Sequence, residues 1–414
     1  MQHLHDFAWP NGIWLALFCH TAKRGVPGVA AVSLDEPALI DFSMKVPSLS
    51  LTRSKTTVAH FKSMFYPRPG TPPTRNQPSK PTVFRRFARK TQGIVMSAHH
   101  LAATPETVSW GRFSASLSPV LEVQPGDTVI IETFSGRREM FPPEGSGMNV
   151  APGLRAICDA DLPVRFGHLL TGPVAIAGAV PGDVLEVRID DVELGADWGF
   201  NTVAPFAGTL DGDLTISKQT LTHIPIDREA RIARMPWGGA LKLKPFFGVM
   251  GVAPPPQFGE ITSREPRVHG GNIDNRLLTA GSTLFLPVWA EGALFSCGDG
   301  HGIQGDGEVC ITALETALTG TFTFILHKQA DMHLSYPRAE TPDSLISMGF
   351  NADLDEALRI ALREMIAIIC ERTPLTPTQA YQLCSLAVDF AVTQSVNGEK
   401  GIHGVLSRAL LTTI

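Results

Sequence analysis

The stretch at residues 298–310, GDGHGIQGDGEVC, concentrates side chains that can bind a metal ion or transfer a proton. Among its glycines it carries two aspartates, together with His301 and Glu308. Glycine lets the backbone approach a small ligand closely, so a small pocket is expected beside these side chains. The stretch is not an EF-hand calcium loop, because acids are missing at two of the loop positions that such a site requires.

A second segment with reactive side chains lies upstream, at residues 269–287, HGGNIDNRLLTAGSTLFLP, where Asp274 precedes a β-type run. Loops at strand ends present side chains to a cleft while the sheet holds the backbone still. Asp274 and His301 form a carboxylate–imidazole pair, which suits Zn²⁺ or a similar first-row ion. His168 in FGHLLTGPV also precedes a β-type run and is a candidate third ligand.

These residues predict a divalent metal, zinc, held by His168, Asp274 and His301, with one position left to water. Glu308 is placed to act as a further ligand or as the base that takes a proton from that water. Each residue also has a structural interpretation. Asp299 and Asp306, both followed by glycine, could simply form hairpin turns, and a lone histidine such as His168 is more often a hydrogen-bonded structural residue.

Aromatic residues could wall the pocket and restrict it to short acyl groups. Trp198 in DWGFN and the pair Phe246 and Phe247 are the candidates, and their alternative role is core packing. One or two such side chains could set the amide preference, because a methylene contributes only about 1–3 kcal/mol to discrimination.

A cysteine nucleophile is the competing chemistry. Cys297 and Cys310 flank the glycine-rich stretch, but both lie in apolar runs, where burial raises the pKa of a thiol and makes it inert. The six cysteines form no Cys-x-x-Cys pair, which favours reduced thiols and a cytoplasmic location. The chain also has no Gly-x-Ser-x-Gly elbow and no P-loop.

The elements that must position these side chains are mainly strands. Residues 116–193 show β-branched residues alternating around two Pro-Gly-Asp turns, in which Asp127 and Asp183 are expected to cap the turn. TLFLPVWAEGALFSCGDG predicts two strands and GEVCITALETALTGTFTFILHK two more, whereas the three prolines at 254–256 indicate a loop.

Helices are expected only near the end of the chain. Residues 351–373 have one apolar helical face with Asn351 as the cap, and Thr376 opens a capping box for a second helix. We therefore predict a β-dominated α+β fold, with sandwich-like or barrel-like strands and a C-terminal helical pair. The predicted units are a β-rich catalytic core at 96–340 and a helical region at 341–414.

The first 95 residues differ from the rest in charge and composition. They carry 13 Lys and Arg against 4 Asp and Glu (+9), which leaves 22 against 36 (−14) for residues 96–414. This Pro-rich leader is expected to be disordered, and it could be a transit peptide, a nucleic-acid arm, or the product of a wrongly chosen start upstream of Met96. No apolar run approaches the length that spans a bilayer, so no membrane anchor is expected.

From about Met96 onward the sequence resembles the acetamidase/formamidase family of amide hydrolases. The resemblance rests on several motifs in order, among them LTGPVAIAGAVPGDVLEVRI, PFFGVMGVAP, GGNIDNRLLTAGSTLFLPV and GALFSCGDGHGIQGDGEVC. It implies cleavage of the C–N bond of short linear amides, such as formamide and acetamide, to carboxylate and ammonia. It further implies a homo-oligomer and a metal-supported site that includes Asp274, His301, Gln304 and Glu308, with Gln304 on the substrate and His168 in the family's HxLTGP segment.

One position departs from the family pattern. Ser109 stands in VSWG, where members often carry a histidine. If that histidine were a ligand or a proton carrier, its loss would weaken metal binding or activity. The rival to the whole interpretation is a non-catalytic β-protein that binds a metal or a small ligand. In either case the expected partner is a small molecule, and neither a nucleic acid nor a membrane.

Overall fold

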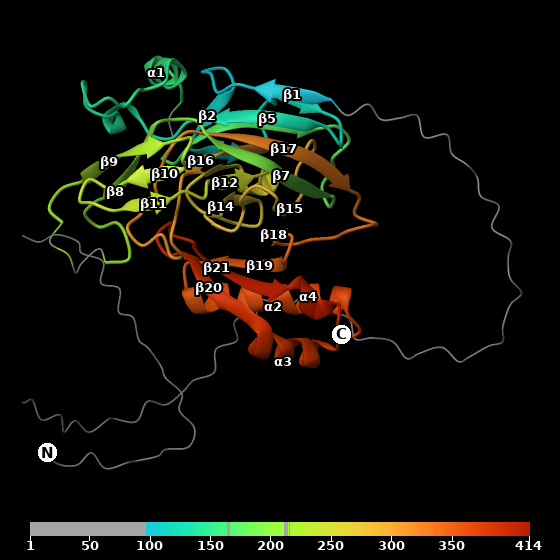
Figure 1. Cartoon of the computed structure of the whole chain (residues 1–414). Coiled ribbons are helices and arrows are strands. Elements are labelled where there is room, and N and C mark those ends of the chain that lie inside the picture. Colours follow the sequence, from blue (N-terminus) through green and yellow to red (C-terminus); the bar gives the residue numbers. More distant parts are fainter. Residues whose placement is uncertain (1–96, 164–165, 211–213, 215) are drawn as a thin grey trace, which may run out of the picture. The chain divides into compact units, whose positions relative to one another are not determined.

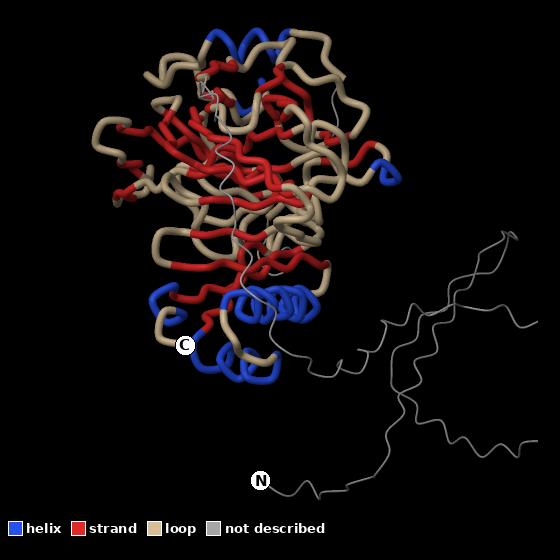
Figure 2. Tube along the Cα trace, turned by 90° about the vertical axis from the view of Figure 1, so that its right-hand side faces the viewer, coloured by secondary structure: helices blue, strands red, loops and turns tan. Residues whose placement is uncertain are grey.

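The computed structural model describes residues 97–163, 166–210, 214 and 216–414. The basic leader assigned to residues 1–95 lies outside these residues. Within them, strands fill the middle of the molecule and helices lie at its periphery (Figure 1; Figure 2). The predicted β-dominated α+β fold is therefore confirmed.

The larger of the two main sheets has nine strands among the described residues, and antiparallel pairing dominates it. In spatial order they are β1 (Ala98–Leu101), β5 (Thr128–Thr133), β17 (Leu318–His327), β7 (Val184–Leu194), β15 (Thr283–Pro287), β18 (Arg338–Glu340), β19 (Ser344–Asn351), β21 (Lys400–Ser407) and β20 (Val388–Gln394).

The second main sheet carries Asp299 and His301, both on its strand β16. Six strands form it in the described part of the chain: β14 (Gly270–Asn272), β12 (Phe246–Gly251), β16 (Phe295–His301), β6 (Leu169–Ile176), β2 (Val108–Trp110) and, beside β6, β4 (Leu121–Val123). Two smaller sheets consist of β11 (Ala240–Lys242), β10 (Ile232–Arg234), β9 (Thr220–Asp227) and β8 (Trp198–Val203), and of β13 (Glu260–Thr262) and β3 (Arg112–Ser114).

A phenylalanine cluster joins the two main sheets. Phe247 of β12 and Phe295 of β16 contact Phe322 of β17, with ring centroids 5.3 and 5.8 Å apart, and Phe324 lies 5.1 Å from Phe295. The four rings are fully buried. Because β17 alternates buried and partly exposed residues, its apolar face packs on the second sheet and fixes the position of β16.

The helices lie at the ends of this sandwich. They are α1 (Pro152–Asp159), α2 (Leu354–Arg372), α3 (Pro377–Ala387) and α4 (Arg408–Leu411), with 3-10 turns η1 (Arg138–Met140) and η2 (Pro256–Phe258). α2 packs on β19 and β21 and lies beside α3 at the C-terminal end of the molecule (Figure 1). No helix in the described ranges is long and apolar enough to cross a membrane.

Local signals at the turns and helix ends are confirmed with one correction. Asp127 accepts the backbone N–H of Gln124, and Asp183 accepts that of Val180, so both cap their Pro-Gly-Asp turns. Thr376 forms the predicted capping box. The cap of α2 is Asp353 and not Asn351, because strand β19 continues through Asn351 and the helix cannot begin until the chain leaves the sheet.

Candidate active site

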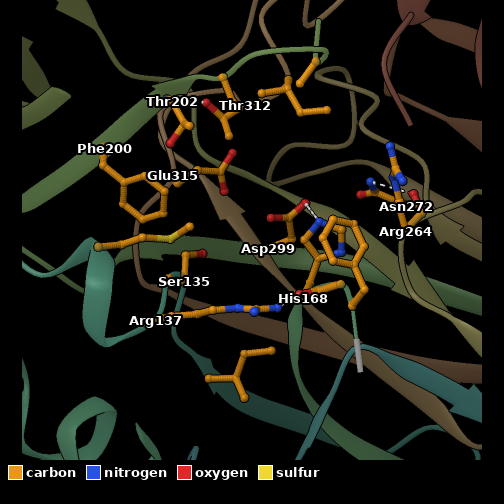
Figure 3. Close-up of a pocket in the computed structure, with 18 of the residues that line it drawn as sticks. Ser135, Arg137, His168, Phe200, Thr202, Arg264, Asn272, Asp299, Thr312 and Glu315 are labelled. Carbon is orange, nitrogen blue, oxygen red and sulfur yellow. Dashed lines mark hydrogen bonds and ion pairs between the residues drawn. The ribbon is translucent and has the colours of Figure 1, made fainter. Parts of the chain in front are cut away.

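A cavity of about 550 Å³ lies between β6, β8 and β16, and three carboxylates reach it. They belong to Asp299, Glu308 and Glu315. Figure 3 shows Asp299 and Glu315 facing the hollow, with His168 beside Asp299. Asp274 and His301 lie directly behind them, fully buried. A polar cluster at the inner end of an otherwise largely apolar cavity is the usual arrangement of a small-molecule site.

Strand β16 positions two members of the cluster. The stretch expected to be a glycine loop is strand as far as His301, so Asp299 and His301 are held by the sheet and not by a flexible loop. The sequence-based interpretation missed this because its glycines suggested a turn. Asp299 instead sits opposite Gly248 of β12, since Phe247 pairs with Gly300 and Val249 with Gly298.

Gly248 makes room for the cluster. A Cβ atom at this position would lie 2.6 Å from Asp274 Oδ1 and from Asp299 Oδ2, and 2.8 Å from His301 Cε1. No side chain tolerates such distances. Gly248 is therefore required because three polar groups converge on its α-carbon, even though its backbone conformation is ordinary for a strand.

Three of the acids have an unusual backbone conformation. Asp274, Asp299 and Glu308 have φ angles of 52°, 57° and 44°. This left-handed region is uncommon for residues other than glycine, and least so for Asp and Asn. Such conformations cost free energy and are concentrated at functional sites, where the surrounding structure imposes them.

Hydrogen bonds set the tautomer of His301. Its Nδ1 lies 2.9 Å from Gln304 Oε1, and the Gln304 amide is oriented because its Nε2 donates to the Asp274 carbonyl at 2.8 Å. His301 Nδ1 therefore carries a proton and donates it to Gln304. Asn397 donates to Asp274 Oδ2 at 2.5 Å, and this hydrogen bond holds the Asp274 carboxylate in place.

The other nitrogen of His301 faces two acids. Nε2 lies 3.3 Å from Asp299 Oδ2 and 3.2 Å from Glu315 Oε1, within ion-pair distance, but at angles that make no hydrogen bond. If this nitrogen were unprotonated, two carboxylates would lie beside it with no positive charge to balance them. In a buried site this arrangement requires positive charge, supplied by a proton or by a cation.

The pKa values of the cluster depend on burial and on the charges of neighbouring groups, which act in opposite directions. Burial raises the pKa of Asp274 to about 6 and that of Glu315 to about 8, although the charge of His301 opposes both shifts. Burial, and next the charge of Asp274, raise the pKa of Glu308 well above its usual value. Burial alone would lower the pKa of His301, but Glu315 and Asp299 outweigh it and raise that pKa well above 6.5.

The donor set fits a divalent cation. Two groups of three residues have donor atoms within 4.8 Å of one another: Asp274, Asp299 and His301, and His301, Glu308 and Glu315. Asp274 Oδ1, His301 Nε2 and Glu308 Oε2 are buried without a hydrogen-bond partner in the described part of the chain. Carboxylate oxygens and imidazole nitrogens are ligands that Zn²⁺ accepts.

The structure brings some of the predicted residues together and separates others. Asp274 Oδ1 lies 4.0 Å from His301 Nδ1, and Glu308 shares their cluster. His168 is at its edge, with Nε2 3.7 Å from Asp299 Oδ2 and Nδ1 3.2 Å from the Ser263 carbonyl. Gln304 contacts His301 and the backbone of Asp274, and does not line the cavity.

The aromatic residues expected to wall the pocket lie elsewhere. Phe247 is in the phenylalanine cluster, and Phe246 is fully buried with its ring edge-on to His301 at 5.0 Å. Trp198 is buried and donates its Nε1 proton to the Asn149 carbonyl, outside the cavity. Core packing, the alternative considered for these side chains, describes their positions, because all three are buried.

Cys297 and Ser109 also lie away from the cavity. Burial raises the pKa of the Cys297 thiol strongly, so the thiolate that a nucleophile needs is disfavoured. Ser109 is buried on β2, and its Oγ has no hydrogen-bond partner among the residues that the structure describes.

Sequence reasoning missed Glu315 and Asn397 and gave Asp299 a turn as its alternative. Glu315 lies next to His301 because its backbone pairs, as single β-bridges, with residues 200 and 301. Asn397 comes from the turn after β20, more than a hundred residues from Asp274. Only the spacing of Asp299 and His301, two apart and hence on one face of a strand, was a signal in the sequence.

A buried carboxylate–imidazole cluster beside a cavity in a β-rich sandwich is typical of a protein that binds a small molecule. The sequence profile of the acetamidase/formamidase family matches residues 96–265 and 259–402. The chain belongs to the acetamidase/formamidase family, and the resemblance found in its motifs is confirmed.

Individual relatives are similar over part or most of the chain. A formamidase of Methylophilus methylotrophus is 26% identical over 247 residues, which are 48% of this chain and 58% of that protein. An acetamidase of Mycolicibacterium smegmatis is 27% identical over 198 residues, 34% of this chain and 49% of that protein. The chain thus spans about half the length of the curated relatives it matches.

Solved structures match over a longer range. An acetamidase from Bacillus halodurans superposes with a TM-score of 0.64 at 30% identity, covering 76% of this chain and 99% of that one. An acetamidase from Yersinia enterocolitica gives 0.66 at 28% identity, covering 77% and 94%. The sandwich and its C-terminal helices are therefore the fold of the family.

Proposed function

We propose that the protein hydrolyses the C–N bond of linear amides to a carboxylate and ammonia, with a divalent cation, zinc, in the buried cluster. One observation carries the proposal: His301 Nε2 faces the carboxylates of Asp299 and Glu315 without a hydrogen bond, beside a cavity large enough for a substrate. Family membership and the formamidase and acetamidase relatives support the reaction.

Asp274, Asp299 and His301 would hold the cation, with His168 next to Asp299 as a further ligand within reach. When bound, a divalent cation polarises a carbonyl oxygen and lowers the pKa of water at the site. Gln304 and Asn397 keep the imidazole and Asp274 in the orientation that binding requires.

Glu308 is the proposed proton carrier because its carboxylate lines the cavity and its Oε2 has no hydrogen-bond partner among the described residues. It takes a proton from the attacking water and delivers it to the nitrogen as the C–N bond breaks and the new C–O bond remains. Burial raises the pKa of Glu308, so its carboxylate takes up a proton more readily than an exposed one would.

The test is ammonia release from formamide, acetamide and propionamide by wild type and by Glu308→Gln. We expect kcat of the variant to fall about 100- to 10,000-fold, the usual contribution of a general acid–base group. Glu193→Gln, on the exposed face of β7, is the matched control and should keep wild-type kcat. A folded Glu308→Gln with undiminished kcat would show that another group carries the proton.

The assay also decides against the alternatives. A non-catalytic metal-binding or ligand-binding protein would release no ammonia from any amide. A cysteine mechanism predicts inactivation by thiol alkylation, which the buried Cys297 should resist. Homo-oligomeric assembly and a cytoplasmic location stay predictions, which sedimentation and cell fractionation can test.

A further inference from the structure

The cavity is larger than formamide or acetamide requires. At about 550 Å³ it falls within the roughly 300–1,000 Å³ of pockets that enclose drug-sized ligands, whereas these amides have only a handful of non-hydrogen atoms. Apolar side chains form much of its wall: Trp110, Phe134, Met140, Leu169, Phe200 and Ile311. The space beyond the carboxylates therefore suits an amide with an apolar body.

Two arginines border the same cavity and converge on one short segment. Arg137 donates from Nη2 to the carbonyl of Gly167 at 3.3 Å, and its guanidinium lies over the Trp110 ring at 5.5 Å. The Arg264 guanidinium lies over the ring of the adjacent Phe166, at 5.2 Å. Figure 3 shows the Arg137 side chain extending from below Ser135 toward His168, and Arg264 beside Asn272.

Neither arginine has an acidic partner among the residues that the structure describes. Stacking on an aromatic face leaves the edge of a guanidinium, with its N–H donors, available for another group. The cavity therefore has three carboxylates at one part of its wall and, at another, two positive charges that no acid within the described ranges pairs with.

This separation of charges would fix the orientation of a bound substrate. A neutral amide can approach the cluster of Asp299, Glu308 and Glu315, where its N–H groups can donate to carboxylate oxygens. A carboxylate at the arginines would instead form charge-assisted hydrogen bonds with planar donors that match its geometry. The apolar wall between the two parts would cover the rest of the molecule.

We propose that the preferred substrate is an amide whose apolar body carries a carboxylate at the end away from the amide, with Arg137 and Arg264 binding that carboxylate. The proposal rests on the amide hydrolysis proposed above and names the substrate class for the same site. Arg137 and Arg264 act in substrate binding and take no part in the bond-breaking step.

The experiment compares two benzamides that differ only in the group opposite the amide on the aromatic ring, which is a carboxylate in one and a methyl in the other. Ammonia release is measured from 4-carbamoylbenzoate and from 4-methylbenzamide, with acetamide as a reference substrate. Wild type is expected to show a kcat/KM at least about ten-fold higher for 4-carbamoylbenzoate, because a charge-assisted hydrogen bond contributes about 1.5–3 kcal/mol, or roughly ten- to 100-fold. The gain should appear mainly in KM.

The variants test whether the arginines cause the preference. In the double variant Arg137→Gln/Arg264→Gln the ratio of the two kcat/KM values should fall to about one or below. The matched control is Arg155→Gln, because Arg155 also stacks on an aromatic ring, that of Phe141 at 5.4 Å, but does not line the cavity. Arg155→Gln should keep the wild-type ratio.

The outcomes separate the two proposals. If acetamide is hydrolysed but 4-carbamoylbenzoate is no better than 4-methylbenzamide, or if the double variant keeps the preference, the carboxylate site is refuted and amide hydrolysis stands. If no amide is hydrolysed, the hydrolytic proposal fails, and calorimetry decides on the binding site. Equal dissociation constants of the two amides for wild type would then refute the carboxylate site as well.

Discussion

Buried aspartates have opposite roles in two regions of this protein. In the Pro-Gly-Asp turns, Asp127 and Asp183 are buried but accept backbone N–H groups, and Asp183 also pairs with Lys328 Nζ at 2.6 Å. In the cluster, Asp274 lies among Asp299, Glu308 and Glu315, Asn397 donates to its Oδ2, and the charges of His301 and His168 lie nearby. The turn aspartates are satisfied by donors, whereas the cluster acids compete for one positive charge.

The pKa values follow from these partners. Burial alone would raise the pKa of Asp183, but the Lys328 ammonium and the N–H groups of Val180 and Gln329 hold it below its usual value. Burial raises the pKa of Asp274 to about 6, since too few donors offset it. Buried acids with strained backbones and raised pKa values are expected at functional sites, and those with satisfied partners at structural ones.

The strongest way to disrupt the cluster is Gly248→Ala. The new Cβ would displace Asp274 and Asp299, so we expect ammonia release to fall more than about 100-fold, since small displacements of catalytic groups have large effects on rate. The free energy of unfolding should decrease by about 1–3 kcal/mol from overpacking. Steady-state kinetics and urea unfolding measure the two effects.

Gly305→Ala is the matched control, because a Cβ there meets no atom within 4 Å. It should retain wild-type activity. Wild-type turnover by Gly248→Ala would mean that the convergence of acids on this glycine has no role in the reaction.

Removal of the cation should affect the cluster and leave the turns intact. Dialysis against a chelator should lower turnover at least about ten-fold, and added Zn²⁺ should restore it. Far-UV circular dichroism should be unchanged, since the sandwich core does not depend on the cluster. An active preparation whose metal analysis finds no divalent cation would contradict the proposed ligands.

The turns should show the reverse pattern. Asp183→Asn removes the charge that pairs with Lys328 and keeps the shape of the side chain, so the free energy of unfolding at pH 7 should fall by about 1–2 kcal/mol. The kcat should stay at the wild-type value. Chemical denaturation measures the loss, with Asp331→Asn, an exposed aspartate, as the control. A loss of turnover with unchanged stability would show that Asp183 has a functional and not a structural role.

The smallest expected effect is the pH dependence of the difference in unfolding free energy between wild type and Asp183→Asn. The folded-state pKa of Asp183 lies below the unfolded value of about 3.9, so its stabilising contribution is present above that pH and disappears as the pH falls through the folded-state pKa. The stability difference between wild type and Asp183→Asn should therefore shrink below about pH 4. A difference that grows on acidification would mean that the carboxylate is not the stabilising form.

Local patterns predicted much of the fold. Alternating β-branched residues located β5, β7 and β17, and the capping box located the start of α3. The cap of α2 was wrong by two residues, because the end of a neighbouring strand overrides a local capping preference. Glycines around Asp299 suggested a loop, but the pairing of β16 with β12 keeps this segment in the sheet.

The site was predicted only in part. Asp274, His301 and Glu308 were singled out because carboxylates and imidazoles near glycines can do chemistry, and the structure places them together. Trp198 and Phe247 were expected at the pocket, but whether an aromatic ring faces a cavity or the core depends on what covers each face of its strand.

The sequence alone determined the residue types available for chemistry, the family, and the strands and turns that carry them, because these depend on local periodicity and on motifs. The tertiary structure decided which acids meet. Glu315 and Asn397 reach His301 and Asp274 from separate segments, through contacts that follow from strand register and sheet packing. The burial that shifts the pKa values of Asp274, His301 and Glu315 is likewise a property of the packed sandwich, and no local stretch of sequence encodes it.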